Sequence, residues 1–164
     1  MKRIELLLEG WDFCYDKEDW APPLRDALKG LTAEQANWRP EGAAANTIWE
    51  NVNHLVFYKE RLLKRWTGEE AAYPSGLTND DTFRVEEHDE AAWQQTLDRL
   101  ESVQAGIRGK LAALSSEAEL EEAIPGKDVE EWLHSLIRHD AYHTGAIILL
   151  RKLQGSWPAR RSFE

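Results

Sequence analysis

The stretch from Val129 to Leu153, VEEWLHSLIRHDAYHTGAIILLRKL, decides how this chain folds and where its chemistry is concentrated. At 3.6 residues per turn it forms a helix with one largely apolar face, which must pack against other helices. His139 and His143 lie on that face, four residues apart, so their Cβ atoms are expected about 5–6 Å from each other. Two imidazoles in this position can bind one metal ion. The alternative is two buried neutral imidazoles, each of which then needs hydrogen-bond partners in the core.

A third ligand for such a metal must come from elsewhere in the chain, and His54 is the best candidate. It lies in a second predicted helix among apolar neighbours, and imidazoles from two helices packed about 8–10 Å apart can meet. We assign His88, at a loop–helix junction, and His134, which points away from His139 on the helical wheel, to the surface. Three neutral imidazoles suit zinc, nickel or ferrous iron and leave one or more coordination positions open.

The same stretch invites comparison with the H-E-x-x-H motif of metalloproteases. Asp140 stands where that motif has its glutamate base, and its side chain is one methylene shorter. After His143 the chain offers no further ligand except Glu164. The sequence therefore does not support a metalloprotease.

Composition narrows the class of protein. We expect the 164 residues to form one domain over 1–164, with a packed core that the eight tryptophans and 42% hydrophobic content support. A net charge of −10 argues against nucleic acid as the main partner, since phosphate binding needs a basic face. Cys14 is the single cysteine, which indicates a reducing compartment, and no apolar run approaches the roughly 20 residues of a membrane span. We expect a cytoplasmic protein without membrane contact.

Apolar periodicity predicts four principal helices and no strands. The first covers residues 2–15 and is followed by a further piece from Asp19 or Trp20 to Leu28. The second runs from a capping box at Thr47 and Glu50 to about residue 66, the third from Asp89 to about 114, and the fourth from Asp128 to about 154. Residues 115–127 are expected to be a polar connection. The connection over residues 67–88 is longer than two antiparallel neighbouring helices need. It is therefore interpreted as a crossover between parallel helices 2 and 3. The predicted fold class is all-α, a four-helix bundle.

Several segments resemble the DinB-like, or YfiT-like, metal-binding four-helix bundles. They are Asn53-His54-Leu55, the run from His139 to Ile147, and the segments 20–28 and 30–36. The resemblance implies an up-down-down-up bundle, a homodimer, and a nickel or zinc ion held by His54, His139 and His143. Ala146 departs from the family pattern, which frequently has glutamine there, so no role of that glutamine is carried over.

The resemblance also suggests what the protein does. Characterised relatives include bacillithiol S-transferases and mycothiol-dependent isomerases, and others are described as metal-dependent hydrolases. We therefore expect a metal-dependent transferase that joins a low-molecular-weight thiol to a small electrophile. A hydrolase that uses metal-bound water and a non-catalytic metal-binding dimeric module remain alternatives. Tyr58, one turn after His54, is a weaker candidate for a catalytic hydroxyl, and Asp140 and Glu50 are candidates to orient the histidines.

Overall fold

The computed structural model describes residues 2–42, 44–69 and 73–159, and this part of the chain is all-helical, without strands. Four of its helices are long: α1 (Arg3–Tyr15), α4 (Ile48–Thr67), α5 (Glu90–Ala112) and α7 (Val129–Leu153). The short ones are α2 (Leu24–Leu28), α3 (Ala33–Asn37), α6 (Glu117–Glu122) and the 3-10 helix η1 (Asp80–Phe83). None of the helices described here is long and apolar enough to cross a membrane.

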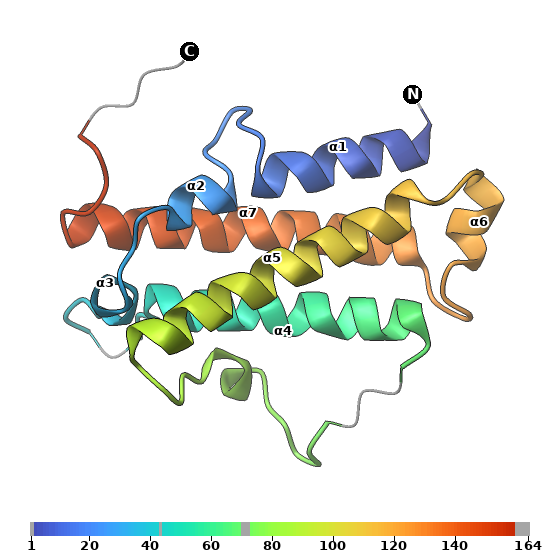
Figure 1. Ribbon diagram of the computed structural model, residues 1–164. Coiled ribbons are helices and arrows are strands. Elements are labelled where there is room, and N and C mark those ends of the chain that lie inside the picture. Colours follow the sequence, from blue (N-terminus) through green and yellow to red (C-terminus); the bar gives the residue numbers. More distant parts are fainter. Residues whose placement is uncertain (1, 43, 70–72, 160–164) are drawn as a thin grey trace.

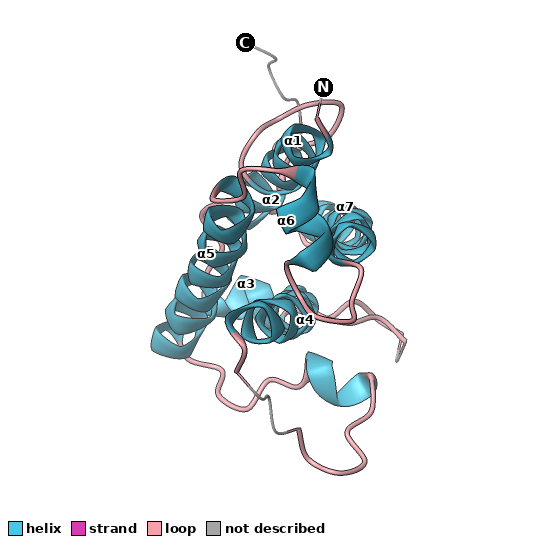
Figure 2. Ribbon diagram, turned by 90° about the vertical axis from the view of Figure 1, so that its right-hand side faces the viewer, coloured by secondary structure: helices cyan, strands magenta, loops and turns pink. Residues whose placement is uncertain are grey.

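The four long helices pack around a common interior. Helix α4 contacts both α5 and α7, and α1 contacts both α7 and α5. Figure 1 shows α4 and α5 running in the same direction and α1 and α7 running in the opposite one. Seen end-on in Figure 2, the loop that carries the chain from the end of α4 back to the start of α5 lies beside α4. The 3-10 helix η1 of this loop contacts α4.

The helix boundaries follow from capping residues that the sequence places there. The Thr47 hydroxyl accepts a hydrogen bond from the Glu50 backbone N–H, and the Glu50 carboxylate accepts one from the Thr47 N–H, which confirms the predicted capping box. Gly68 ends α4 with a φ of 76°, a left-handed conformation that glycine adopts without strain. Asp128 caps α7 by accepting from the Glu131 N–H, as predicted.

Two expectations about the connections were wrong. The helical piece after α1 begins at Leu24 rather than at Asp19 or Trp20, and the side chain of Trp20 is 97% exposed. Pro22 and Pro23 have no backbone N–H to donate, so a regular helix cannot pass through them and starts only after the second proline. Residues 115–127 are not a plain connection but contain α6, which Ser116 caps by accepting from the Glu119 N–H.

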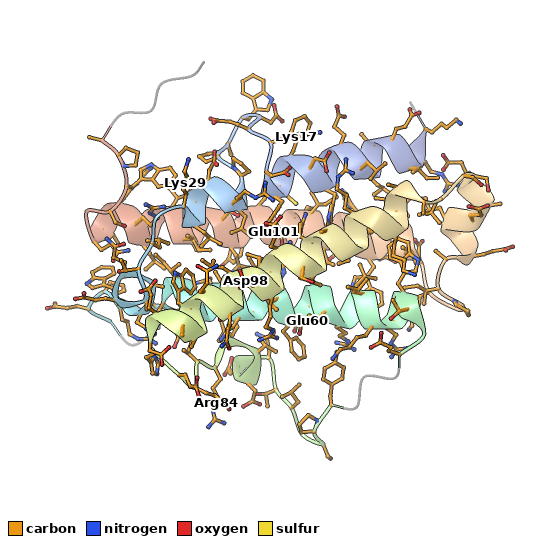
Figure 3. All side chains as sticks on the ribbon, viewed as in Figure 1. Lys17, Lys29, Glu60, Arg84, Asp98 and Glu101 are labelled. Carbon is orange, nitrogen blue, oxygen red and sulfur yellow. The ribbon has the colours of Figure 1, made fainter. Side chains whose placement is uncertain are left out.

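Buried apolar side chains form two clusters along the length of the molecule. One lies among α2, α3 and the first half of α4, with Trp49 and Trp93 at its centre. The other lies around α6 and includes Trp11 of α1 and Leu133 of α7. Charged side chains such as Glu60, Asp98 and Glu101 project from the outer faces of α4 and α5 (Figure 3). The histidines of the candidate site lie between these clusters, on the α4–α7 interface.

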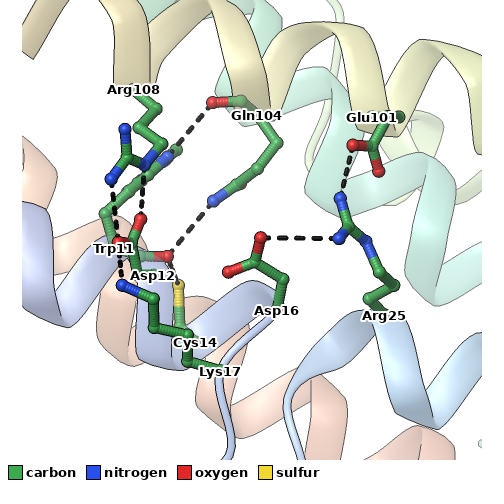
Figure 4. A network of polar contacts seen from close by, with 9 residues as sticks. All are labelled: Trp11, Asp12, Cys14, Asp16, Lys17, Arg25, Glu101, Gln104 and Arg108. Carbon is green, nitrogen blue, oxygen red and sulfur yellow. Dashed lines mark hydrogen bonds and ion pairs between the residues drawn. The ribbon is translucent and has the colours of Figure 1, made fainter.

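A polar network fixes α1 against α5 (Figure 4). The Asp12 carboxylate pairs with Arg108 at 2.6 Å and with Lys17 at 2.7 Å, and these two cations lower its pKa. The Trp11 indole donates to the Gln104 carbonyl, while the Gln104 amide donates to the Trp11 carbonyl. The network holds α1 and α5 together, so that α4 and α7 face the same interior.

Candidate metal centre

Three imidazoles meet between α4 and α7. His54 comes from α4, and His139 and His143 come from successive turns of α7. The Nε2 atom of His139 lies 2.9 Å from Nε2 of His54 and 3.1 Å from Nε2 of His143. One nitrogen from each ring lies within 4.8 Å of the other two. The structure thus brings together all three histidines that the sequence proposed as ligands, while His88 and His134 are exposed.

The outer nitrogen of His54 is held by the loop between α4 and α5. Its Nδ1 atom lies 2.5 Å from the Thr82 hydroxyl oxygen, and that hydroxyl donates its own hydrogen to the Asn79 carbonyl at 2.6 Å. Since the threonine proton is already used, His54 must donate its Nδ1–H to Thr82. The Nε2 atom of a neutral His54 therefore carries a free lone pair that faces the other two histidines.

The outer nitrogen of His143 is fixed in the same way by α4 itself. Its Nδ1 atom lies 2.7 Å from the side-chain oxygen of Asn51, whose amide nitrogen donates to the Thr47 carbonyl. An amide oxygen can only accept, so His143 donates its Nδ1–H and presents the Nε2 lone pair inward. Asn51 and Thr82 hold two rings in the tautomer that a metal ligand requires.

This arrangement fits a divalent cation. A single proton on Nε2 of His139 can satisfy one of the two facing lone pairs, which leaves the other without a donor. A cation placed among the three nitrogens satisfies all of them. Nitrogens about 2.0–2.1 Å from a tetrahedral zinc lie roughly 3.4 Å from one another, a spacing that small ring rotations reach from the distances observed. A three-histidine set accepts nickel or ferrous iron equally well on ligand type, so it does not select one metal.

Burial keeps the three rings neutral. Desolvation is the largest cause that lowers the pKa of His54 to about 3 and that of His143 to about 4, and the neighbouring histidines add to it. Desolvation also lowers the pKa of His139, although nearby Asp140 works against this. Neutral imidazole is the form that binds metals, so the lone pairs are available at neutral pH.

Two cavities open on the cluster from different sides. The first, of about 430 Å³, has His54, His139, Tyr58, Arg61, Asn79 and Trp132 among its lining residues. The second, of about 450 Å³, includes His54, His143, Phe83, Tyr142, Ala146 and Leu149. His54 borders both, so a ligand in either cavity reaches the histidines. The first cavity contains the charged Arg61, whereas the second combines apolar side chains such as Phe83 and Leu149 with polar ones such as Asn46 and Asn51.

Comparison with known proteins agrees with this site. The model of a family described as the DinB superfamily matches residues 22–147, a segment that includes all three histidines. This chain belongs to the DinB superfamily. Comparisons with curated proteins and with solved structures gave no match.

Other residues around the centre of this DinB-superfamily protein were not foreseen. Phe83 stacks on the His54 ring with 3.9 Å between centroids, and Thr82 beside it holds the ring nitrogen. Both come from η1, in a loop without a periodic pattern, so no sequence pattern indicated them. Asn51 lies three residues before His54, on the same side of α4, and that spacing was a usable signal. Tyr58, by contrast, was already a candidate from the sequence, and it lines the first cavity, where its hydroxyl donates to Asn79.

Asp140 and Glu50 do not orient the histidines of the DinB-superfamily site, which corrects both suggestions. The Glu50 carboxylate caps α4 and pairs with Arg39. The Asp140 carboxylate pairs with Lys59 of α4 and lies 3.4 Å from the Cys14 thiol instead. The sequence pattern did not indicate the Lys59–Asp140 ion pair, because a lysine inside a helix is normally interpreted as a solvent-exposed residue.

Cys14 is a structural residue in this geometry. Its thiol lies 3.4 Å from the Asp140 carboxylate, and burial raises its pKa well above the ordinary range. A thiol that stays protonated is a poor nucleophile. Cys14 is therefore a largely buried structural side chain rather than a reactive one.

Proposed function

We propose that this protein is a metal-dependent transferase that adds a low-molecular-weight thiol to a small electrophile. The observation that carries the proposal is the pair of cavities that border the same histidine cluster from two sides. A transfer between two substrates needs two binding places that meet at one centre, and this arrangement provides them. A bound divalent metal lowers the pKa of a thiol so that the nucleophilic thiolate is present at neutral pH.

The roles of the chain's own residues follow from their positions. His54, His139 and His143 are proposed to hold the metal, with zinc or nickel as the first choices and iron as a third. Asn51 and Thr82 keep two of the rings in the required tautomer. Phe83 covers one face of His54 and excludes water from it. Tyr58 is proposed to offer its hydroxyl, now donated to Asn79, to a substrate in the first cavity.

We also propose a topology for the helices and a dimeric state for the protein. We interpret the four long helices as an up-down-down-up four-helix bundle, a single domain over 1–164, on the basis of the helix directions in Figure 1. We propose a cytoplasmic homodimer that binds neither nucleic acid nor membranes. A groove of about 590 Å³ on the outside of α1 and α7, with Leu6, Leu7, Gly10 and Ile137 in its lining, supports the dimer.

Thiol consumption tests the function. Zinc- or nickel-loaded protein is incubated with 2-mercaptoethanol and the electrophile 1-chloro-2,4-dinitrobenzene, and thioether formation is followed by absorbance. We expect a faster reaction than with metal-free protein or with His139→Ala. Equal rates for all three would reject a transferase. Turnover of nitrophenyl esters without thiol would instead support the hydrolase, and stoichiometric metal with neither activity would support a non-catalytic binding module.

A further inference from the structure

Arg61 gives the first cavity its charge. With the histidines neutral, it is the only residue lining this cavity in the described part of the chain that carries a formal charge. No carboxylate lines the cavity with it. Since the protein has 30 acidic and 20 basic residues, an arginine in a cavity without an acidic neighbour is unexpected.

Among the described residues, Arg61 has no carboxylate partner, a property that it shares with Arg65, Arg84, Arg138 and Arg151. Its Nε atom is buried and has no hydrogen-bond partner, and no ion pair joins it to an acidic residue within the ranges that the structure describes. Its guanidinium lies 5.8 Å from the centre of the Tyr73 ring. By contrast, five other arginines each pair with at least one carboxylate: Arg3, Arg25, Arg39, Arg99 and Arg108. A half-buried donor without a partner is costly unless a ligand satisfies it.

Arg61 lines the same cavity as His54 and His139. It follows His54 by seven residues, which is two turns or about 10.5 Å along α4, on the same side of the helix. Helical side chains lean toward the N-terminus, so the guanidinium reaches back toward His54. On the facing helix α7, Ser135 and Trp132 precede His139 by one and two turns and line the same cavity. The cavity therefore follows the α4–α7 groove from the histidines to Arg61.

The groove does not become more positive beyond Arg61. The adjoining cavity, of about 340 Å³, is also lined by Arg61, together with Arg65 and Lys127 and with the carboxylates of Asp128 and Glu131. Opposite charges compensate one another there, whereas none of the described residues that line the first cavity with Arg61 is acidic. An anionic group in the first cavity is thus best placed at Arg61, about two helical turns along α4 from His54.

We propose that Arg61 binds a carboxylate carried by the thiol substrate, so that the thiol end of the same molecule lies at the three histidines. The inference rests on the proposed transferase function and adds the substrate class, a small thiol acid. A guanidinium binds a carboxylate through two parallel hydrogen bonds, which fixes the orientation of the molecule as well as its charge. The second cavity, which none of the described charged side chains lines, is left for the electrophile.

A matched pair of thiols tests the inference. Binding of 3-mercaptopropionate and of its neutral amide, 3-mercaptopropionamide, to the zinc-loaded protein is measured by isothermal titration calorimetry. We expect the acid to bind about ten- to hundredfold more tightly than the amide, as a charge-assisted hydrogen bond provides. Arg61→Gln should abolish this difference, and Arg61→Lys should restore part of it. Arg99→Gln, which removes the same charge outside both cavities, should leave the difference unchanged.

The outcomes separate the two proposals. If the acid and the amide bind with equal affinity to the native protein, the carboxylate site at Arg61 is wrong while thiol binding at the histidines stands. The same conclusion follows if Arg61→Gln retains the native preference. If neither thiol binds, the transferase proposal fails and the Arg61 site fails with it. The comparison of acid with amide uses native protein, so equal affinities refute the site even if an Arg61 variant does not fold.

Discussion

The ammonium group of Lys59 lies 2.5 Å from the carboxylate of Asp140, and neither side chain is exposed. Lys59 belongs to α4 and Asp140 to α7, so the ion pair joins the two helices that carry the histidines. The Gln104 side chain of α5 accepts a further hydrogen bond from Lys59, and the ammonium lies 4.8 Å from the Trp11 ring of α1. One buried cation thus contacts all four long helices.

Removing one member of this pair should destabilise the protein strongly. Lys59→Met leaves the Asp140 carboxylate buried without a counter-ion, which typically costs about 3–5 kcal/mol. The double variant Lys59→Met/Asp140→Leu, with no buried charge left, should recover most of that loss. Urea denaturation measures both. Arg99→Ala, which breaks an exposed pair with Glu60, serves as the control and should cost no more than about 1 kcal/mol. A Lys59→Met variant as stable as this control would contradict the prediction.

Metal binding should depend on His139 and not on His134. Both lie on α7, but only His139 contributes to the cluster, whereas the His134 side chain is exposed. We expect His139→Ala to lose stoichiometric metal and His134→Ala to retain it, as measured by elemental analysis after dialysis against a metal buffer. Equal metal content in the two variants would mean that the cluster is not the binding site.

The residues behind the ligands should tune the affinity. Asn51→Leu and Thr82→Val each remove the acceptor that fixes one imidazole tautomer, and such changes typically weaken metal binding by about 10–100-fold. Competition with a chromophoric chelator measures the affinity. Thr78→Val removes a hydroxyl of the same loop that contacts Asp81 instead of a histidine, so it should leave the affinity unchanged. Native affinity in Thr82→Val would show that the loop does not orient His54.

The metal-free protein should lose stability as the pH falls below about 6.5. The pKa values of His54 and His143, about 3 and about 4, lie below the ordinary 6.5. Between pH 6.5 and 4 the unfolded chain therefore binds more protons at these positions than the folded one, so the free energy of unfolding decreases with falling pH. Above pH 6.5 both states are neutral there, and these groups cause no change.

Denaturation of the metal-free protein at several pH values checks this dependence. The double variant His54→Leu/His143→Leu should have a flatter stability profile between pH 6.5 and 4 than the native chain. A profile as steep as the native one would assign the acid sensitivity to other groups. Asp12 is a separate contributor, because its pKa is lowered and its stabilising effect is lost only below about pH 4.

The sequence was sufficient to predict the elements that depend on local patterns. The capping box of Thr47 and Glu50 and the cap at Asp128 are local, so the starts of α4 and α7 were predictable. The convergence of His54 with His139 and His143 followed from the apolar faces on which they lie, together with the family resemblance. Whether they bind a metal in the protein remains a prediction.

Features that depend on contacts between distant segments were not predictable. Thr82 lies 28 residues after His54, in a loop with no periodic pattern, so nothing in the sequence indicated their hydrogen bond. The partnership of Lys59 with Asp140 spans 81 residues, and each residue alone is typical of a helix surface. The predicted start of α2 was wrong for a different reason. Pro22 and Pro23 fit the first turn of a helix as well as the loop before it.

Thr82 and Phe83 belong to a connection rather than to one of the long helices. Neither residue belongs to the two buried apolar clusters that the long helices share. Changes at these positions are therefore expected to alter the surroundings of His54 more than the packing of the long helices. In this architecture, residues of η1 shape the surroundings of the histidine site, whereas the long helices supply most of the buried core. The two parts of the chain can therefore change separately during evolution.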